Sequence, residues 1–274
     1  MLFWVVLACG IASITVALLA PLLLTVGRWQ LLHPRTALSV WFGAFFIGIG
    51  LALAGLIIGV AGAVAASHTP IGSETLLMTI LGWAGLGAFG AIAAFVAVSA
   101  EPVLSSETGA LHSLAPIAIS REQRRGFTLV RFESDQPIAF AAPGRPPEIL
   151  LSTRMESLLP SAQLQAVLAH EYAHLRQHHA WATRIARINA LCLPRTHSAR
   201  ALRRATTLLV ELAADDQAAR LAGPAHLANA LSTLAAASND AGLELRAERL
   251  VDKRWPGAVK RRRPPAAFAR DSSI

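Results

Sequence analysis

Residues 170–174 read His-Glu-Tyr-Ala-His, which places two histidines four positions apart with a glutamate between them. In an α-helix, residues at this spacing lie on one face, so both imidazoles can reach a single Zn²⁺. Glu171 is turned away from ligation but stays close enough to take a proton from a water that the zinc activates. The pattern therefore predicts metal-assisted hydrolysis. The alternative interpretation is an amphipathic helix with two solvated histidines.

A catalytic zinc needs a third protein ligand and one position left for water. The chain has two cysteines, Cys9 and Cys192, which are too few for a thiolate site, so histidine and carboxylate must supply the ligands. His178 lies about 12 Å of helix rise from His170, too far to share an ion with it unless the helix bends. Gln177 stands where the three-histidine form of the motif has a helix-breaking glycine, so we reject His178.

Glu211 is the better candidate for the third ligand. It follows His174 by 37 residues and opens the segment Glu-Leu-Ala-Ala-Asp, which ends at Asp215. On a helix, Glu211 would ligate zinc, and Asp215 would accept a ring N–H from a ligating histidine and so fix its tautomer. The alternative is an ordinary solvated acidic turn. Two such motifs on two predicted helices together favour a metal site.

Helices and a small sheet must position these residues. Apolar residues at helical spacing predict a helix from Ser161 to about His179 or a few turns further, a second from about Ala199 to Leu221, and a third from about Ala225 to Ala237. From Phe127 to Thr153, alternating apolar residues flank a turn-rich stretch and predict a small sheet or hairpin. The chemistry is therefore expected on helices that follow a small sheet.

The first hundred residues are of a different kind. Of the 274 residues in the chain, 54% are hydrophobic and 15% charged, and the charged residues before position 101 are Arg28, Arg35 and Glu74. Three apolar stretches, about 3–26, 38–66 and 76–99, each exceed the roughly 20 residues that cross a bilayer. This composition excludes a purely soluble enzyme and predicts three transmembrane helices.

Loop charges predict the orientation of these helices. The first link contains Arg28 and Arg35, whereas the second, residues 67–75, has no Lys or Arg. Because basic loops stay in the cytoplasm, everything after residue 100 is predicted to be cytoplasmic, in a multi-pass protein of the cell membrane. Gly55 and Gly59 have the spacing that lets membrane helices approach closely, which leaves a homodimer open.

The block from Ala139 to Asp215 resembles a known family. An Ala-Phe-Ala-Ala-Pro-Gly turn, an Ile-Leu-Leu-Ser strand, Ala-Val-Leu-Ala-His-Glu-x-x-His and Glu-x-x-Ala-Asp resemble the BlaR/MecR-type signal-transducing membrane metallopeptidases and, more distantly, the HtpX and CAAX-prenyl-protease type. These are gluzincins, with His, His and Glu on zinc. The resemblance implies a mainly α membrane protein: three N-terminal transmembrane helices and a cytoplasmic α+β metallopeptidase domain with a small sheet and the HExxH helix.

The resemblance also implies roles for individual residues. His170, His174 and Glu211 would bind one zinc, and Glu171 would be general base and then acid. Asp215 would support a ligand from behind. Arg246 resembles an arginine–leucine element that follows the site and could stabilise charge there, and His226 is a further candidate for stabilising an oxyanion.

The implied function is an integral-membrane zinc endopeptidase that cleaves a transcriptional repressor, or itself, in signalling. The strand near Glu148 to Ser152 is predicted to pair with the extended substrate. One alternative is a protease for membrane-protein quality control. Another is a non-catalytic receptor or scaffold with a degenerate protease domain.

Three regions are expected: a transmembrane domain at 1–100, the metallopeptidase domain at 101–250, and a basic tail without fixed fold at 251–274. The predicted partners are a protein or peptide substrate, such as a repressor, and membrane lipid. The net charge of +8 is accounted for by the tail and by the excess of arginine after residue 100, which is expected of a cytoplasmic segment, so no direct nucleic-acid binding is expected.

Overall fold

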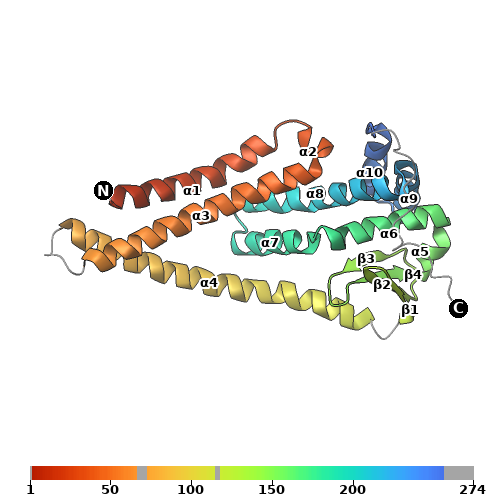
Figure 1. Cartoon of the computed structure of the whole chain (residues 1–274), viewed down its shortest axis with the longest axis horizontal. Helices are drawn as coiled ribbons and strands as arrows, with labels where there is room; N and C mark the ends of the chain where they lie inside the picture. Colours follow the sequence, from red (N-terminus) through yellow and green to blue (C-terminus); the bar gives the residue numbers. More distant parts are fainter. Residues whose placement is uncertain (1, 67–72, 115–117, 256–274) are drawn as a thin grey trace. The chain divides into compact units, whose positions relative to one another are not determined.

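A computed structural model of the chain describes residues 2–66, 73–114 and 118–255. By their contacts the residues form two compact units: residues 1–105 with 184–206 are unit 1, and residues 106–183 with 207–274 are unit 2. The elements in chain order (Figure 1) are α1 (Leu2–Leu24), α2 (Trp29–Leu32), α3 (Pro34–Ala66), α4 (Ser73–Leu114), β1 (Ala118–Arg124), β2 (Phe127–Phe132), β3 (Ala139–Ala142), β4 (Glu148–Ser152), α5 (Thr153–Leu158), α6 (Ser161–Arg176), α7 (His179–Cys192), α8 (His197–Ala222), α9 (Pro224–Ser238) and α10 (Ala241–Asp252).

Three helices of unit 1 are long and apolar enough to cross a membrane. The candidate spans are Leu2–Leu24, Pro34–Ala65 and Thr79–Leu104, which confirms the three apolar helices predicted from hydropathy. Helix α4 continues to Leu114, with Pro102 inside it, and so outlasts the predicted apolar stretch. Hydropathy locates the end of the apolar part of a helix, whereas the helix itself continues until the backbone leaves the helical conformation.

Glycines set how closely these helices pack. A Cβ added at Gly55 of α3 would lie 3.2 Å from the Cβ of Cys9 on α1, and one added at Gly82 of α4 would lie 2.6 Å from the Cβ of Ala63 on α3. Side chains at these positions would push neighbouring helices apart. Gly55, one of the pair at GxxxG spacing, is thus occupied by a contact within the chain.

Large apolar side chains of unit 1 point outward. Ile14, Leu23 and Ile57 are 62%, 67% and 66% exposed. Contiguous apolar surface of this kind is unfavourable in water and is the expected surface of a helix bundle in lipid.

A four-stranded sheet of order β1-β2-β4-β3 lies in unit 2. β1 pairs antiparallel with β2, β2 pairs parallel with β4, and β4 pairs antiparallel with β3. The small sheet is therefore as predicted, but a hairpin between 127–132 and 148–152 is wrong, because these strands are parallel. After β2 the chain first forms β3 in the opposite direction and then returns as β4 between the two.

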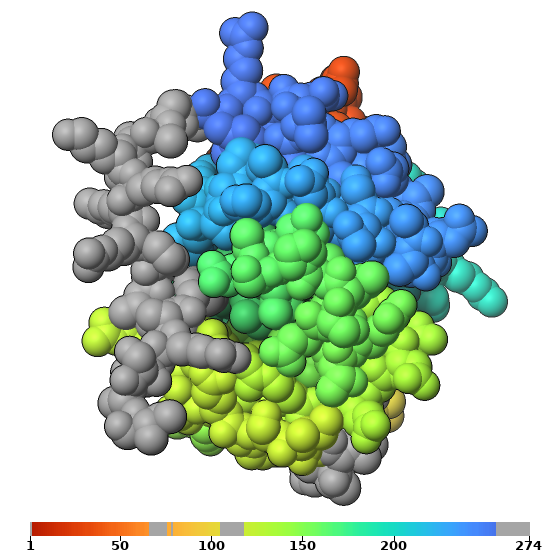
Figure 2. Space-filling view, turned by 90° about the vertical axis from the view of Figure 1, so that its right-hand side faces the viewer, coloured from red at the N-terminus to blue at the C-terminus, as the bar shows by residue number. Residues whose placement is uncertain are grey.

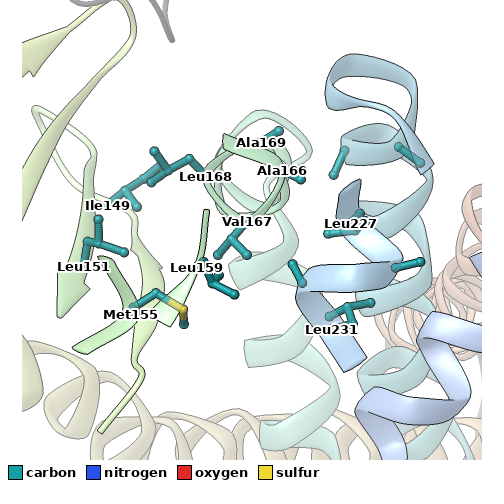
Figure 3. Packing of buried hydrophobic residues seen from close by; sticks show 14 of the residues in the cluster. Ile149, Leu151, Met155, Leu159, Ala166, Val167, Leu168, Ala169, Leu227 and Leu231 are labelled. Carbon is teal, nitrogen blue, oxygen red and sulfur yellow. The ribbon is translucent and has the colours of Figure 1, made fainter. Parts of the chain in front are cut away.

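Helix α6 is the centre of the core of unit 2 and passes between the sheet and α9 (Figure 3). Leu168 points toward Ile149 on β4, whereas Ala166 and Ala169 face α9. The small alanines let α9 approach closely, and Leu227 of α9 is 1% exposed there. Figure 2 shows the same order at the surface, with green residues of α5 and α6 between the yellow-green strands and the blue C-terminal helices.

The predicted helix from Ser161 through His179 and beyond is two helices. α6 ends at Arg176, and α7 begins at His179. Between them His178 adopts a φ of 53°, in the left-handed region that ends helices and redirects the chain.

The two later helices follow the prediction closely. Gly223, with a φ of 101°, ends α8 and precedes Pro224, the first residue of α9. Helix α10 was not predicted. The first residues of the predicted tail, 251–255, are instead part of unit 2: α10 runs to Asp252, Lys253 pairs with Asp216 of α8, and Trp255 packs against the core. Residues 256–274 of the predicted tail lie outside the described residues.

Candidate metal centre

Two imidazoles of α6 converge one helical turn apart. The Nε2 atoms of His170 and His174 are 3.1 Å from each other. His170 is buried and His174 is partly exposed. The helix places both rings on one face because four residues make just over one turn, as the sequence predicted.

The third donor comes from α8. Glu211 places one carboxylate oxygen 3.4 Å from Nε2 of His170 and the other 3.6 Å from Nε2 of His174. The donor atoms of these three residues all lie within 4.8 Å of one another. The sequence therefore anticipated the arrangement of a carboxylate from a neighbouring helix opposite two histidines.

These separations fit a tetrahedral zinc. An ion about 2.0–2.2 Å from each ligand atom holds those atoms about 3.3–3.6 Å apart. The two imidazole nitrogens are 3.1 Å apart, and each lies 3.4 or 3.6 Å from a different oxygen of the Glu211 carboxylate, close to this range. Nitrogen and carboxylate oxygen are also the donors that zinc accepts from proteins, so His170, His174 and Glu211 suit the ion.

Asp215 and Arg246 support the donors from behind. Asp215 lies one turn after Glu211 on α8, and its Oδ1 is 2.9 Å from Nδ1 of His170. Arg246 of α10 donates two hydrogen bonds to Asp215, at 2.8 and 2.7 Å, and its third nitrogen is 2.9 Å from Glu211. The guanidinium thus fixes both carboxylates at once, which is the geometry that suits arginine.

A second acidic residue fixes α10, which carries Arg246, against α8. Asp216, buried on α8, pairs with Arg249 at 2.9 Å and with Lys253 at 2.5 Å. Because a helix that is held at two further points cannot rotate freely, these contacts keep Arg246 aimed at the metal ligands. The sequence singled out Arg246 but not this support.

The electrostatics differ between the two histidines. Burial alone would lower the pKa of His170, but the carboxylates of Asp215 and Glu211 outweigh it and raise that pKa to about 10. Burial, followed by the charge of His170, lowers the pKa of His174 to about 3. For Asp215, burial would raise the pKa, yet hydrogen bonds from Arg246 and His170 hold it well below the ordinary value. Glu211 behaves alike: hydrogen bonding by His170 overcomes burial and lowers its pKa.

Glu171 stands apart from the three donors and faces the same cavity. Burial raises its pKa to about 7, against the opposing charge of His170 and a hydrogen bond from the backbone of Ala141. A carboxyl group with a pKa near neutrality can both accept and release a proton, which is what a general base that later acts as an acid requires.

His179 is a residue of the site that the sequence reasoning missed. Its Nδ1 lies 3.1 Å from Nδ1 of His174, on the side of that ring away from Nε2, and its side chain is buried. His179 therefore holds the second ligand as Asp215 holds the first. His178, rejected as a ligand, is exposed. The helix ends before His178 although position 177 is glutamine and not the helix-breaking glycine. This break turns His179 toward His174.

His226 takes no part in this arrangement. It is exposed near the start of α9, and the described residues that line the cavity at the metal centre do not include it. His226 was proposed only because of its residue type, and it does not contact the three donors in the described part of the chain.

A cavity of about 320 Å³ opens beside the donors. His170, Glu171, Glu211 and Arg246 line one side of it. The remaining wall is mostly apolar and comprises Pro137, Ile138, Ala139, Met155, Val167, Leu227, Leu231, Leu234, Ser238 and Leu243. The volume is at the small end of the range for ligand sites, which suits one or two side chains.

Strand β3 forms the edge of the sheet next to this cavity. In its antiparallel pairing with β4, alternate residues point their backbone groups toward β4. Ile138 exchanges bonds with Ser152 on that side, whereas Ala141 bonds to Glu171, so Ala139 and Ala141 present their backbones to the outer edge. The expectation that Glu148–Ser152 binds substrate is wrong, since β4 is paired on both sides.

Comparison with known families supports the metal centre. Residues 107–244, half of the chain, match the family model of Peptidase family M48 and include all three donors. The chain belongs to Peptidase family M48. M48 peptidases are metal-dependent, typically with zinc, so the family agrees with the donor set. With the three apolar helices of unit 1, this M48 chain is a membrane metallopeptidase. No curated protein and no solved structure matches the chain.

Proposed function

We propose that this M48 chain is an integral-membrane zinc endopeptidase that cleaves peptide bonds on the cytoplasmic side. The observation that carries the proposal is the convergence of His170, His174 and Glu211, with Glu171 facing the same cavity. A binding protein or scaffold would not need a partly buried carboxyl group of near-neutral pKa beside three such donors.

Each residue has a chemical role in this proposal. When bound, zinc polarises the scissile carbonyl and acidifies the attacking water. Glu171 accepts the proton of that water and passes it to the leaving amine. Asp215 and His179 hold the ligand rings, and Arg246 keeps Glu211 in place while offsetting the negative charge of the two carboxylates.

The substrate is proposed to bind as an added strand. Ala139 lines the cavity, and its backbone faces the outer edge of β3, where an extended peptide can form main-chain hydrogen bonds. A peptide in this place passes beside Glu171. The apolar wall formed by Val167, Leu227 and Leu231 then favours an apolar side chain next to the scissile bond.

Substitution of Glu171 tests the reaction. The variant Glu171→Gln keeps the shape of the side chain and loses the proton acceptor. With β-casein as an unfolded substrate and the full-length protein in detergent, we expect cleavage to fall by about 10²- to 10⁴-fold with zinc content unchanged. Glu248→Gln, an exposed change on α10, is the matched control. Equal cleavage by wild type and Glu171→Gln would remove the enzyme proposal.

The cytoplasmic orientation rests on Arg28, which lies between α1 and α3, and on Arg35 in the first turn of α3. It is tested with a variant that lacks Cys9 and Cys192 and carries Ser157→Cys, an exposed position of unit 2. A membrane-impermeant maleimide should label this cysteine only after the cells are permeabilised. Labelling in intact cells would place unit 2 outside.

The resemblance to BlaR/MecR-type proteins supports a narrower proposal, in which the enzyme cleaves a repressor or itself in response to a signal. The HtpX-type resemblance supports quality control of membrane proteins instead. Comparison of new protein N-termini in cells with wild type and with Glu171→Gln separates the two. One or a few cleaved proteins support the regulator, and many unrelated membrane proteins support quality control.

A further inference from the structure

The end of α7 and the start of α8, residues 184–206, form a helical hairpin whose contacts belong to unit 1, together with the three apolar helices. The turn between the helices spans residues 193–196. Arg200 donates a hydrogen bond to the carbonyl of Pro194 at 2.9 Å and so ties the start of α8 to the turn. We call residues 184–206 the arginine hairpin.

Charge on this hairpin has a single sign. Residues 172–210 contain seven arginines and no Asp or Glu. Within the hairpin, the exposed arginines are Arg187, Arg195, Arg200, Arg203 and Arg204. On α8, residues 200, 203 and 204 are spaced so that they share one helical face. The hairpin is thus a cationic surface in which no acidic neighbour along the chain offsets the charge.

Apolar side chains stand at the tip of the same surface. Leu191 and Leu193 are 50% and 49% exposed, while Ala190, Ala199 and Leu202 are buried on the inner side. Exposed leucines flanked by arginines are typical of helices that lie in the headgroup region, where apolar groups enter the acyl boundary and guanidinium groups remain among the phosphates.

We propose that the arginine hairpin binds the anionic headgroups of the membrane in which α1, α3 and α4 are embedded. Phosphates of a nucleic acid would also suit the arginines, but they would leave Leu191 and Leu193 in water. Membership in the unit that holds the membrane spans favours lipid over a soluble acidic partner. The arginine hairpin shares no residue with the metal centre, so this proposal does not depend on peptidase activity.

Amide hydrogen exchange tests the proposal with the full-length protein. The protein is placed in nanodiscs of phosphatidylcholine alone and in discs that also contain phosphatidylglycerol. We expect exchange in residues 184–206 to be at least about tenfold slower with phosphatidylglycerol, since each basic group near an anionic surface strengthens binding by about fivefold. High salt should remove the difference.

A charge-matched pair of variants locates the effect. Glutamine at Arg195, Arg200, Arg203 and Arg204 should abolish the dependence on phosphatidylglycerol. Glutamine at the exposed arginines of unit 2, Arg125, Arg154, Arg176 and Arg220, should preserve it. Equal exchange of the wild type in the two kinds of disc would overturn the proposal, whether or not the variants fold. Protection by a DNA oligonucleotide, but not by phosphatidylglycerol, would overturn it in favour of nucleic acid.

Discussion

The two units of this chain distribute apolar and charged side chains in opposite ways. In unit 1, Ile14 is 62% exposed, whereas in unit 2 the carboxylate of Asp215 is fully buried. Exposed apolar surface is stable when the solvent is lipid, and a buried carboxylate is stable when Arg246 and His170 compensate its charge. The comparison teaches that exposure has a different meaning in each unit, because the surroundings of each unit differ.

The largest expected effect comes from breaking the compensated charges of unit 2. Glu211→Ala removes a donor and leaves Arg246 without one partner. We expect zinc affinity to fall by at least about 10³-fold. Loss of a residue that only hydrogen-bonds a metal ligand lowers the affinity by about 10- to 100-fold. Chelator competition on the purified protein measures this. Unchanged affinity would show that another residue is the third ligand.

A matched pair of exposed positions sharpens the comparison next. Ile14 on α1 and Leu245 on α10 are 62% and 66% exposed. Ile14→Lys should oppose membrane insertion by about 3 kcal/mol, because a charge enters hydrocarbon, whereas Leu245→Lys places its charge in water. The membrane-inserted fraction of each variant measures this. Similar behaviour of the two would mean that lipid does not surround α1.

Substitutions of the adjacent residues His179 and His178 test whether the contact of His179 with His174 supports zinc binding. His179→Phe should lower zinc affinity by about 10- to 100-fold, because His174 loses the group that orients its ring. His178→Phe, at the exposed neighbour, should change little. Zinc titration of both variants decides this. Equal affinities would reduce His179 to a packing residue.

The smallest expected effect lies inside the bundle of unit 1. Gly82→Ala should destabilise the protein by about 1 kcal/mol, since the new Cβ overlaps Ala63 and the helices must move apart. A Cβ at Gly87, on the same helix, meets no described atom within 4 Å, so Gly87→Ala is the control. Thermal unfolding in detergent compares them. A stable Gly82→Ala would mean that the contact of α3 with α4 is loose.

Features that depend on local pattern could be predicted from sequence. Hydropathy alone identified the three apolar helices, and the spacing of His170, His174 and Glu211 predicted that their donors would converge. Each of these depends on residues within one helix, or on chemistry that restricts the residue types. Helix α10 also carried a local signal, since Leu243, Ala247 and Leu250 recur at helical spacing, but it was not recognised.

Features that depend on long-range geometry could not be predicted. The parallel pairing of β2 with β4 depends on the intervening chain running in the opposite direction as β3 at the edge of the sheet, which alternation within each strand does not reveal. β1 was missed because Ala118–Arg124 is largely polar. The contact of His179 with His174 requires a left-handed backbone conformation at position 178. The residue there is histidine, and no glycine in the sequence indicates this conformation.

The edge strand β3 has four residues, and its outer side is where a substrate is proposed to pair. A peptide segment in a helix or in the middle of a sheet has already committed its amide and carbonyl groups and has none left to offer. Such an enzyme would select substrates by whether the segment to be cleaved is unfolded. Compactly folded proteins would resist cleavage, whereas locally unfolded, damaged or newly made chains would be cleaved. The susceptibility of a substrate to cleavage would then depend less on its amino-acid sequence than on whether its backbone can adopt an extended conformation.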